Sequence, residues 1–282
     1  MKLFDAHNHL QDERFGGRQA ELLAACQREG VVRMVVNGSC EADWPTVLEL
    51  ARGHRQVLPS FGYHPWHVGA RTPDWRQRLG HFLDQVPGAV GEIGLDRWIL
   101  EQPAHWQKAG GEPPAAPAPL VEQEAVFLAQ LQMAAERDLP VSIHCLRAWG
   151  RLHELLDARP RPRRGFLLHS YGGPREMVPA FVKLGAYFSF PGYYAHARKA
   201  RQREAFQSVP VDRLLLETDA PDQPLPDALN AHPLVAAVTG QGLNHPANLG
   251  AVYRFVAQML DEGLEALADR VEENFARLFG GR

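Results

Sequence analysis

The chain has 282 residues, 45% of them hydrophobic and 22% charged, and a net charge of -3 at pH 7. This composition is typical of a globular protein, and the net charge argues against a broad basic surface for nucleic acid. A nucleic-acid substrate stays possible, because bound metal ions would add positive charge that the count omits.

Few features of the sequence indicate where in the cell the protein is located. Cys26, Cys40 and Cys145 form neither a CxxC spacing nor an even framework, so a reducing compartment is expected. The N-terminus has no signal-peptide pattern, and no apolar run reaches membrane-spanning length. We therefore expect a cytoplasmic protein without membrane contact, and nothing in the sequence indicates an obligate protein partner.

Apolar strand-like runs alternate with helix-like periodicity along the chain. After an opening strand that leads to Asp5, the expected strands are 31–36, 57–61, 89–96, 140–144, 166–169, 186–190 and 213–216. The expected helices are 19–29, 44–51, 74–86, 120–137, 151–158, 175–184, 199–207, 249–260 and 264–279.

This eightfold strand–helix alternation predicts a parallel sheet covered by helices. The length is close to the roughly 250 residues of a single α/β barrel, so the predicted fold is a TIM-type (β/α)8 barrel forming one domain over 1–282. A doubly wound open sheet is the alternative. Polar residues at the carboxyl ends of the strands favour the barrel, since only a barrel brings those ends to one mouth, where active sites of this fold lie.

The first candidate site is Asp5-Ala6-His7-Asn8-His9. Alternate residues of a strand share a face, so His7 and His9 could hold one metal ion, with Asp5 orienting a ligand.

Further candidates follow later strands. Glu92 closes an apolar strand and would be costly to bury unpaired. Asp219 shares a strand face with Glu217, and two stacked carboxylates repel unless cations accompany them. For His144 or His169 alone, a buried histidine bonded to the backbone is the simpler interpretation. Together, these residues predict a metal site at the mouth.

The segment 101–119 carries five prolines and several alanines and cannot form a regular helix or strand. It follows the strand that bears Glu92, so it would project from the mouth. It is either a lid carrying Trp98, His105 and Trp106 or a disordered insertion.

Seven motifs in order resemble the TatD family of metal-dependent hydrolases, over nearly the whole chain. They are Asp5-x-His7-x-His9, Gly62-x-His64-Pro65, Gly91-Glu92-Ile93-Gly94-Leu95-Asp96, Leu139-Pro140 leading to His144, His169 with Gly172, Glu217-Thr218-Asp219-Ala220-Pro221, and Asn274-x-x-x-Leu278-Phe279. The resemblance implies a TIM-type barrel with two divalent metal ions, and several members of the family are deoxyribonucleases.

The resemblance also implies roles for individual residues. One metal ion would be held by His7, His9, Glu92 and Asp219. Glu92 would bridge to a second ion, held also by His144 and His169. Asp219 would activate the attacking water, and His64 would contact the scissile group of the substrate. Apart from the resemblance, the strand positions of Asp5 and Glu217 predict that they support the ligands.

The chain departs from the family pattern where substrate is expected to bind. Trp66 stands where a second histidine usually follows His64-Pro65, Arg147 comes one residue later than the usual arginine, and the sixth motif reads His169-Ser170-Tyr171. The candidate substrate contacts are Tyr63, Trp66, His67 and Arg147. No metal ligand is altered, so the metal site of the family can be assigned to this chain. The substrate of the family cannot be assigned in the same way.

The predicted function is a two-metal phosphodiesterase that trims single-stranded DNA ends. Tyr63, Trp66, Trp98 and Trp106 are expected in loops at the mouth, where stacking on unpaired bases is worth about 1–3 kcal/mol per base. The alternatives are a metal-dependent amide or ester hydrolase and a metal-binding protein that has lost catalysis. The metal can be Mg, Mn or Zn, since histidines suit Zn and carboxylate-rich nuclease sites often use Mg or Mn.

Overall fold

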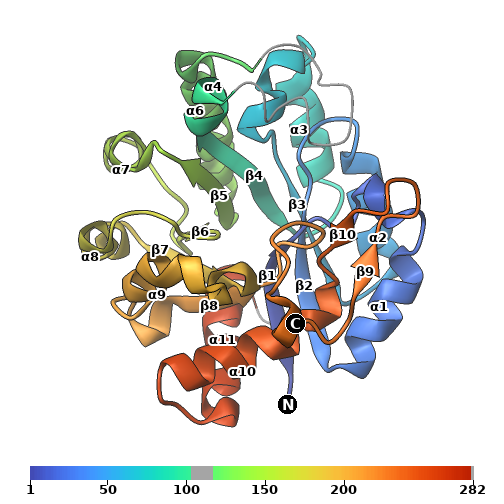
Figure 1. The fold of residues 1–282 in the computed structure, drawn as a ribbon. Coiled ribbons are helices and arrows are strands. Elements are labelled where there is room, and N and C mark those ends of the chain that lie inside the picture. The colour runs from blue at the N-terminus through green and yellow to red at the C-terminus, as the bar shows by residue number, and fades with distance from the viewer. Residues whose placement is uncertain (103–116, 281–282) are drawn as a thin grey trace.

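A computed structural model describes residues 1–102 and 117–280. Eight parallel strands form one sheet in the order of the chain, from β1 to β8, with helices around them (Figure 1). The strands are β1 (Leu3–Asn8), β2 (Val31–Asn37), β3 (Val57–Phe61), β4 (Ala89–Asp96), β5 (Val141–Leu146), β6 (Phe166–Leu168), β7 (Ala186–Pro191) and β8 (Leu214–Glu217). Sequential order with parallel pairing at each step is the arrangement of a (β/α)8 barrel, which confirms the predicted fold.

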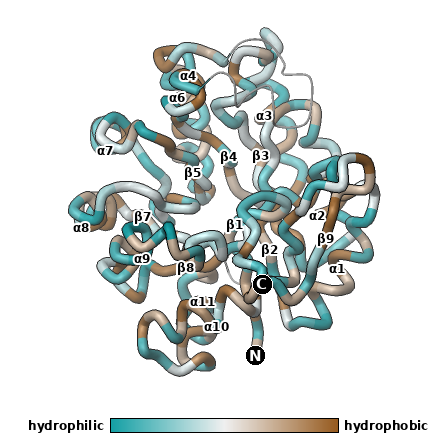
Figure 2. The backbone as a smooth tube through the Cα atoms, viewed as in Figure 1, coloured by the Kyte–Doolittle hydropathy of each residue, from teal (hydrophilic) through white to brown (hydrophobic). Residues whose placement is uncertain are grey.

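The helices surround the sheet and carry both hydrophobic and hydrophilic residues (Figure 2). They are α1 (Gln19–Arg28), α2 (Trp44–Gly53), α3 (Trp75–Leu83), α4 (Trp98–Glu101), α6 (Leu120–Arg137), α7 (Trp149–Asp157), α8 (Val178–Lys183), α9 (Ala200–Phe206), α10 (Leu249–Met259) and α11 (Leu264–Phe279). Their apolar faces pack on the strands, as amphipathic periodicity requires.

The seam between β8 and β1 closes the barrel. The Asp219 N–H donates to the His7 carbonyl at 3.0 Å, and the His9 N–H donates to the Ala220 carbonyl at 2.7 Å. The Asp5 carboxylate accepts from the Thr218 N–H at 3.0 Å and from the Thr218 hydroxyl at 2.6 Å. These bonds hold the first and last metal-site motifs of the chain side by side.

Helix α11 packs beneath β1 and β8. The Phe4 and Phe275 rings lie 5.1 Å apart, and the Asn274 side-chain amide donates to the Leu214 and Val211 carbonyls at 2.8 Å. The asparagine of the last sequence motif therefore ties the C-terminal helix to β8.

Strand β4 is crowded on both sides of Glu92. Its pairing with β5 is irregular between Val90 and Ile93, as in a β-bulge, which re-aims side chains near functional sites. A Cβ atom at Gly91 would lie 2.8 Å from Ser142 Cβ. A Cβ atom at Gly94, where φ is +157°, would lie 2.0 Å from the His144 carbonyl oxygen. Only glycine fits at these positions, and this places Glu92 beside the β5 ligand.

The sequence predicted most elements to within three residues at each end. It missed the two-residue strands β9 (Leu234–Val235) and β10 (Gly242–Leu243), which form an antiparallel hairpin in the long connection after β8. The segment predicted to extend from 175 to 184 begins as a 3₁₀ turn and becomes helix α8 at Val178. The greater part of the 101–119 segment, with His105 and Trp106, lies outside the described residues.

No helix within 1–102 and 117–280 is long and apolar enough to cross a membrane.

Gly94→Ala should destabilise the protein by about 3 kcal/mol or more, since the new methyl group would overlap the backbone of β5 rather than a movable side chain. Thermal unfolding followed by circular dichroism measures the change. Gly150→Ala is the matched control, because it meets nothing within 4 Å in helix α7 and should be neutral or stabilising by up to about 1 kcal/mol. Equal melting temperatures for the two variants would contradict this account of β4.

Candidate metal centre

Four histidines surround the Glu92 carboxylate at the carboxyl-terminal end of the barrel. Oε2 lies 3.3 Å from His7 Nε2 and 3.1 Å from His9 Nε2. Oε1 lies 3.1 Å from His144 Nδ1 and 2.7 Å from His169 Nε2. Each carboxylate oxygen therefore faces its own pair of imidazoles, which is the arrangement required of a bridging ligand.

Asp219 completes the cluster on the side of β1. Its Oδ1 lies 3.6 Å from His7 Nε2 and 3.7 Å from His9 Nε2. The ligand atoms of three sets of residues lie close enough together to hold a metal ion: His7, His9 and Glu92; His7, His169 and Asp219; and His64, Glu92 and His144. We call His7, His9, Glu92, His144, His169 and Asp219 the histidine–carboxylate cluster.

His9 has one ring nitrogen, Nε2, that faces the cluster and another, Nδ1, that points away from it. The hydrogen bond at Nδ1 shows that Nε2 is suited to bind a metal ion. His9 Nδ1 lies 2.8 Å from the Asn37 carbonyl, which can only accept, so Nδ1 carries a proton. Neutral His9 then directs a lone pair from Nε2 toward the Glu92 carboxylate, which is also an acceptor. Two acceptors 3.1 Å apart require a cation between them, either a proton or a metal ion.

The structure corrects the predicted way in which Asp5 supports the site. The imidazole of His7 is fixed by the Ser142 hydroxyl, 2.8 Å from Nδ1. Asp5 instead accepts from the His7 backbone N–H at 3.3 Å and from Asn8 and Thr218, so it holds the backbone and the barrel seam. Ser142 precedes His144 by two residues on β5, and nothing in the sequence indicated that it would contact β1.

Asp96 is a functional candidate that the sequence prediction left out of the site. It is fully buried at the end of β4, and its Oδ2 lies 3.1 Å from His144 Nε2 and 2.6 Å from Trp66 Nε1. A carboxylate on the far nitrogen of a ligating histidine fixes its tautomer and raises its basicity. The signal was present, because Asp96 follows Glu92 by four residues in one motif.

Glu217, predicted to support the ligands, lies beside His169. Its Oε1 lies 3.7 Å from His169 Nδ1 and accepts from the Ser170 N–H at 2.8 Å and from the Ser170 hydroxyl at 2.5 Å. Ser189 donates to the other oxygen. With these donors Glu217 can stay ionised while buried, and its charge favours a proton on His169 Nδ1, which leaves Nε2 to face Glu92.

His64 differs from the proposed ligand histidines in that its protonated nitrogen faces the cluster. Its Nδ1 accepts a hydrogen bond from the Trp66 backbone N–H at 3.2 Å, so the proton of the neutral ring sits on Nε2. Burial lowers the pKa of His64 well below its ordinary value and keeps the ring neutral. His64 therefore offers a donor at Nε2, 3.5 Å from Glu92, rather than a lone pair.

Gln223 is a second residue that the sequence prediction missed. Its side-chain amide donates to Asp219 Oδ2 and to the Ser170 hydroxyl, the latter at 2.7 Å. This leaves Asp219 Oδ1 directed at His7 and His9. No sequence motif marked this position, because an amide in a loop has no characteristic spacing.

The candidate substrate contacts have different surroundings. Tyr63 is wrong as a mouth residue: its side chain is 2% exposed, packs edge-on against Trp44 and Trp75, and donates to Glu41 at 2.6 Å. The aromatic cluster between β3 and the outer helices holds the ring away from the mouth.

The side chains of the other three candidate substrate contacts are at least partly exposed. Trp66 and His67 are partly buried after β3, and the His64 ring packs edge-on against both. Arg147 is exposed after β5 and pairs with Glu101 at 2.5 Å. The role of these residues in substrate binding stays a prediction.

The buried charges shift several pKa values. Burial alone would raise the pKa of Glu92, but the surrounding imidazoles hold it well below its ordinary value. Burial lowers the pKa of His7 to about 4. Burial alone would also lower the pKa values of His9 and His144. For His9, Glu92 and Asp219 outweigh burial and raise the pKa to about 9. For His144, Asp96 and Glu92 do the same and raise the pKa to about 9. Burial raises the pKa of Asp219, and neighbouring carboxylates add to this.

The fold and the site define a class of protein: a (β/α)8 barrel with a histidine–carboxylate cluster at the carboxyl ends of its strands. A family model described as TatD related DNase matches residues 4–280, and the chain belongs to that family.

Its relatives include a protein named 3'-5' ssDNA/RNA exonuclease TatD from Pantoea sp. (strain At-9b), which is 30% identical over 282 residues covering 98% of this chain and 99% of the relative. The uncharacterized metal-dependent hydrolase YjjV of Escherichia coli (strain K12) is 26% identical over 281 residues, covering 99% of this chain and 98% of the relative. The crystal structure of YjjV, a TatD homologue from Escherichia coli K12, superposes with a TM-score of 0.82, covering 99% and 98% of the two chains. Together with the cluster, these relatives support the use of divalent metal ions.

Binding of a divalent metal ion at pH 7 should release protons, because His9 and His144 have pKa values of about 9 and must lose a proton to act as ligands. The apparent metal affinity should therefore rise as the pH increases from about 6 to about 9. Calorimetric titration in buffers of different ionisation enthalpy counts the protons. A binding heat that is the same in every buffer would contradict the assignment of these two histidines.

Gln223→Leu should lower turnover by about 10- to 100-fold, because Asp219 Oδ2 loses the donor that orients it. The acid limb of the pH–rate profile should also move to higher pH, since removing a donor to the ionised carboxylate raises its pKa. Gln132→Leu is the matched control: this exposed glutamine on α6 donates to Glu136 at 2.8 Å. An unchanged profile for Gln223→Leu would show that the amide does not position Asp219.

Proposed function

We propose that the chain is a metal-dependent phosphodiesterase that removes nucleotides from the end of single-stranded DNA. The observation that carries this proposal is the geometry of Glu92, whose two oxygens each face a separate set of imidazoles. Relatives named 3'-5' ssDNA/RNA exonuclease TatD support the substrate class.

The proposal assigns two divalent ions to the cluster. One ion would be held by His7, His9, Glu92 and Asp219, and the other by Glu92, His144 and His169. When bound, the ions would stabilise negative charge on the attacking and leaving oxygens of a phosphoryl transfer. The far nitrogens of His9 and His144 contact Asn37 and Asp96, so the orientation of these rings is set before any ion binds.

Asp219 is the proposed general base. Its Oδ1 is directed into the cluster, while Gln223 holds Oδ2. Burial and neighbouring carboxylates raise the pKa of Asp219, which makes it a better proton acceptor than an exposed aspartate. In the proposed reaction Asp219 takes a proton from the water that attacks phosphorus.

His64 is the proposed donor to the scissile phosphate. Its Nδ1 is occupied by the Trp66 backbone N–H, so the Nε2–H is available to a phosphoryl oxygen. A neutral imidazole donor binds a charged oxygen at the cluster without competing for the metal ions. This role agrees with the tautomer, whereas a ligand role would require the opposite one.

Trp66 is the proposed contact for a terminal base. Its indole N–H donates to Asp96 at 2.6 Å, and the ring packs edge-on against His64. The ring is therefore held beside the proposed phosphate donor. Stacking on an unpaired base contributes about 1–3 kcal/mol, and a base within a duplex could not stack in this way.

The test compares linear single-stranded, linear double-stranded and closed circular single-stranded DNA as substrates, with Mg, Mn or Zn and with a chelator control. The linear single strand should be cleaved fastest and release mononucleotides. Faster cleavage of the closed circle would contradict action at an end. Cleavage of amide or ester substrates alone would contradict the phosphodiesterase proposal.

Asp219→Asn should lower turnover by about 100-fold or more, since it removes the proposed base and a ligand charge. Glu217→Gln should be less damaging at equal metal occupancy, because Glu217 contacts His169 and Ser170 rather than the cluster centre. Steady-state kinetics and metal analysis of both variants provide the measurement. A larger loss in Glu217→Gln would reverse the assigned order of the two carboxylates.

A further inference from the structure

Several arginines near the barrel mouth are paired with carboxylates. Four arginines in or beside the loops that follow the strands each lie within 4 Å of an acidic side chain: Arg14 with Asp12 and Asp222, Arg71 with Glu122, Arg97 with Glu101, and Arg147 with Glu101. These arginines are already committed to ion pairs, which agrees with the absence of a broad basic surface in the composition.

Arg198 and Lys199, in the loop after β7, have different partners. The Lys199 ammonium lies 4.6 Å from the centre of the Tyr193 ring, and the Arg198 guanidinium lies 5.2 Å from it. Arg198 also donates to the Tyr193 hydroxyl at 2.7 Å. Among the described residues, no carboxylate lies within 4 Å of either cation, so neither is committed to an ion pair in that part of the chain.

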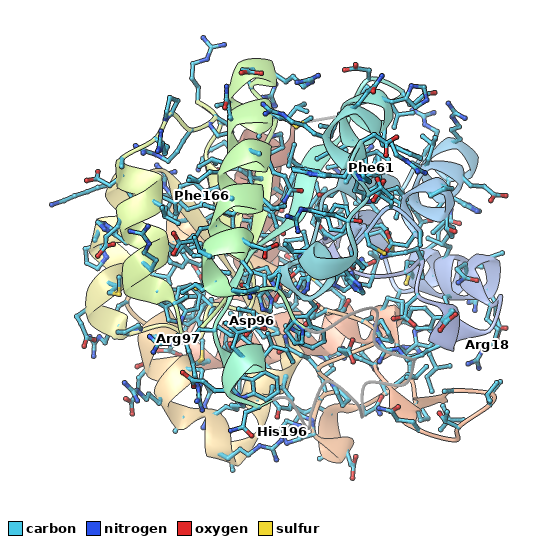
Figure 3. The ribbon with its side chains drawn as sticks, turned by 90° about the horizontal axis from the view of Figure 1, so that it is seen from above. Arg18, Phe61, Asp96, Arg97, Phe166 and His196 are labelled. Atoms are coloured by element: carbon cyan, nitrogen blue, oxygen red, sulfur yellow. The ribbon has the colours of Figure 1, made fainter. Side chains whose placement is uncertain are left out.

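This loop contacts segments that neighbour the histidine–carboxylate cluster in two places. Tyr194, whose ring lies 5.8 Å from the Lys199 ammonium, donates to the Ser170 carbonyl at 2.6 Å, next to His169. His196 Nε2 lies 3.1 Å from the Pro224 carbonyl, next to Gln223. Figure 3 shows His196 at the same end of the barrel as Asp96, and Phe166 toward the other end.

The charges on the two sides of the cluster also differ. Trp66 and Asp96 form the side at β3 and β4, where an aromatic ring and a carboxylate are joined by a hydrogen bond. The side at β7 carries two cations held on a tyrosine ring. A single strand has one edge of bases and one edge of phosphates. The Trp66 ring on one side of the cluster matches the base edge, and the two cations on the other side match the phosphate edge.

We propose that Tyr193, Arg198 and Lys199 form a phosphate-binding site for the part of the single strand that lies beyond the cleaved bond. Tyr193 holds the two cations in place, and each neutralises one phosphate. This inference rests on the proposed nuclease function and adds the path of the uncleaved strand, which leaves the cluster on the side of β7. Two cations in one loop would give this chain, whose net charge is -3, a local positive site for a polyanion.

The test measures kcat/KM across a range of NaCl concentrations for two substrates. One is a single strand of about ten nucleotides, a length typical of single-strand sites, and the other is bis(4-nitrophenyl) phosphate, a small diester with one phosphate and no further strand. The double variant Arg198→Gln/Lys199→Gln is compared with Arg159→Gln/Lys183→Gln. The control removes the same charge at the other end of the barrel, after α7 and at the end of α8.

For the oligonucleotide, Arg198→Gln/Lys199→Gln should make the slope of log kcat/KM against log salt shallower by about 1.4, since each phosphate contact on a single strand contributes about 0.7. The ratio of oligonucleotide to small-diester kcat/KM should also fall. The control variant should keep both values of the unsubstituted chain.

An unchanged slope in Arg198→Gln/Lys199→Gln, or an equal change in the control variant, would overturn the phosphate site while leaving the nuclease function intact. Failure of the unsubstituted chain to cleave either substrate with any metal would overturn the nuclease function, and the phosphate site with it.

Discussion

The Glu92 carboxylate, buried among imidazoles, is the constraint on which the site depends. A carboxylate that is 2% exposed needs positive charge close by, and the histidines of three other strands supply it when they are protonated or when they share metal ions with it. The glycines on both sides of Glu92 allow β4 to pack closely against β5, because any larger residue there would push the two strands apart. Core packing and function are thus set by the same few residues.

Contacts at the ring nitrogens that point away from the cluster orient the histidines. Ser142, the Asn37 carbonyl, Asp96 and Glu217 each face one imidazole at the atom that does not point into the cluster. His64 is the exception, since its proton is on the nitrogen that faces inward. The proposed ligands thus present a lone pair to the cluster and the proposed substrate donor presents an N–H, although all five rings lie close together.

The sequence predicted the barrel and the convergence of the six ligand candidates because both depend on periodic patterns and on residues at strand ends. It could not predict contacts between side chains of distant strands. Ser142 contacts His7 across the barrel, and Gln223 reaches Asp219 from a loop without a recognisable motif. The prediction that Tyr63 lies at the mouth was wrong, because a position next to His64 does not determine the side of β3 on which the ring packs.

The most direct test of this account is the metal content of Glu92→Gln, which keeps the size of the side chain and removes its charge. Glu41→Gln is the matched control, because Glu41 is a buried acid near the same end of the barrel that accepts from Tyr63 and Thr72 instead of histidines. Elemental analysis after equilibration with Mn or Zn should find two ions per chain in the unsubstituted protein and in Glu41→Gln, and a loss of both in Glu92→Gln. Two ions retained in Glu92→Gln would contradict the bridging role and with it the organisation of the site.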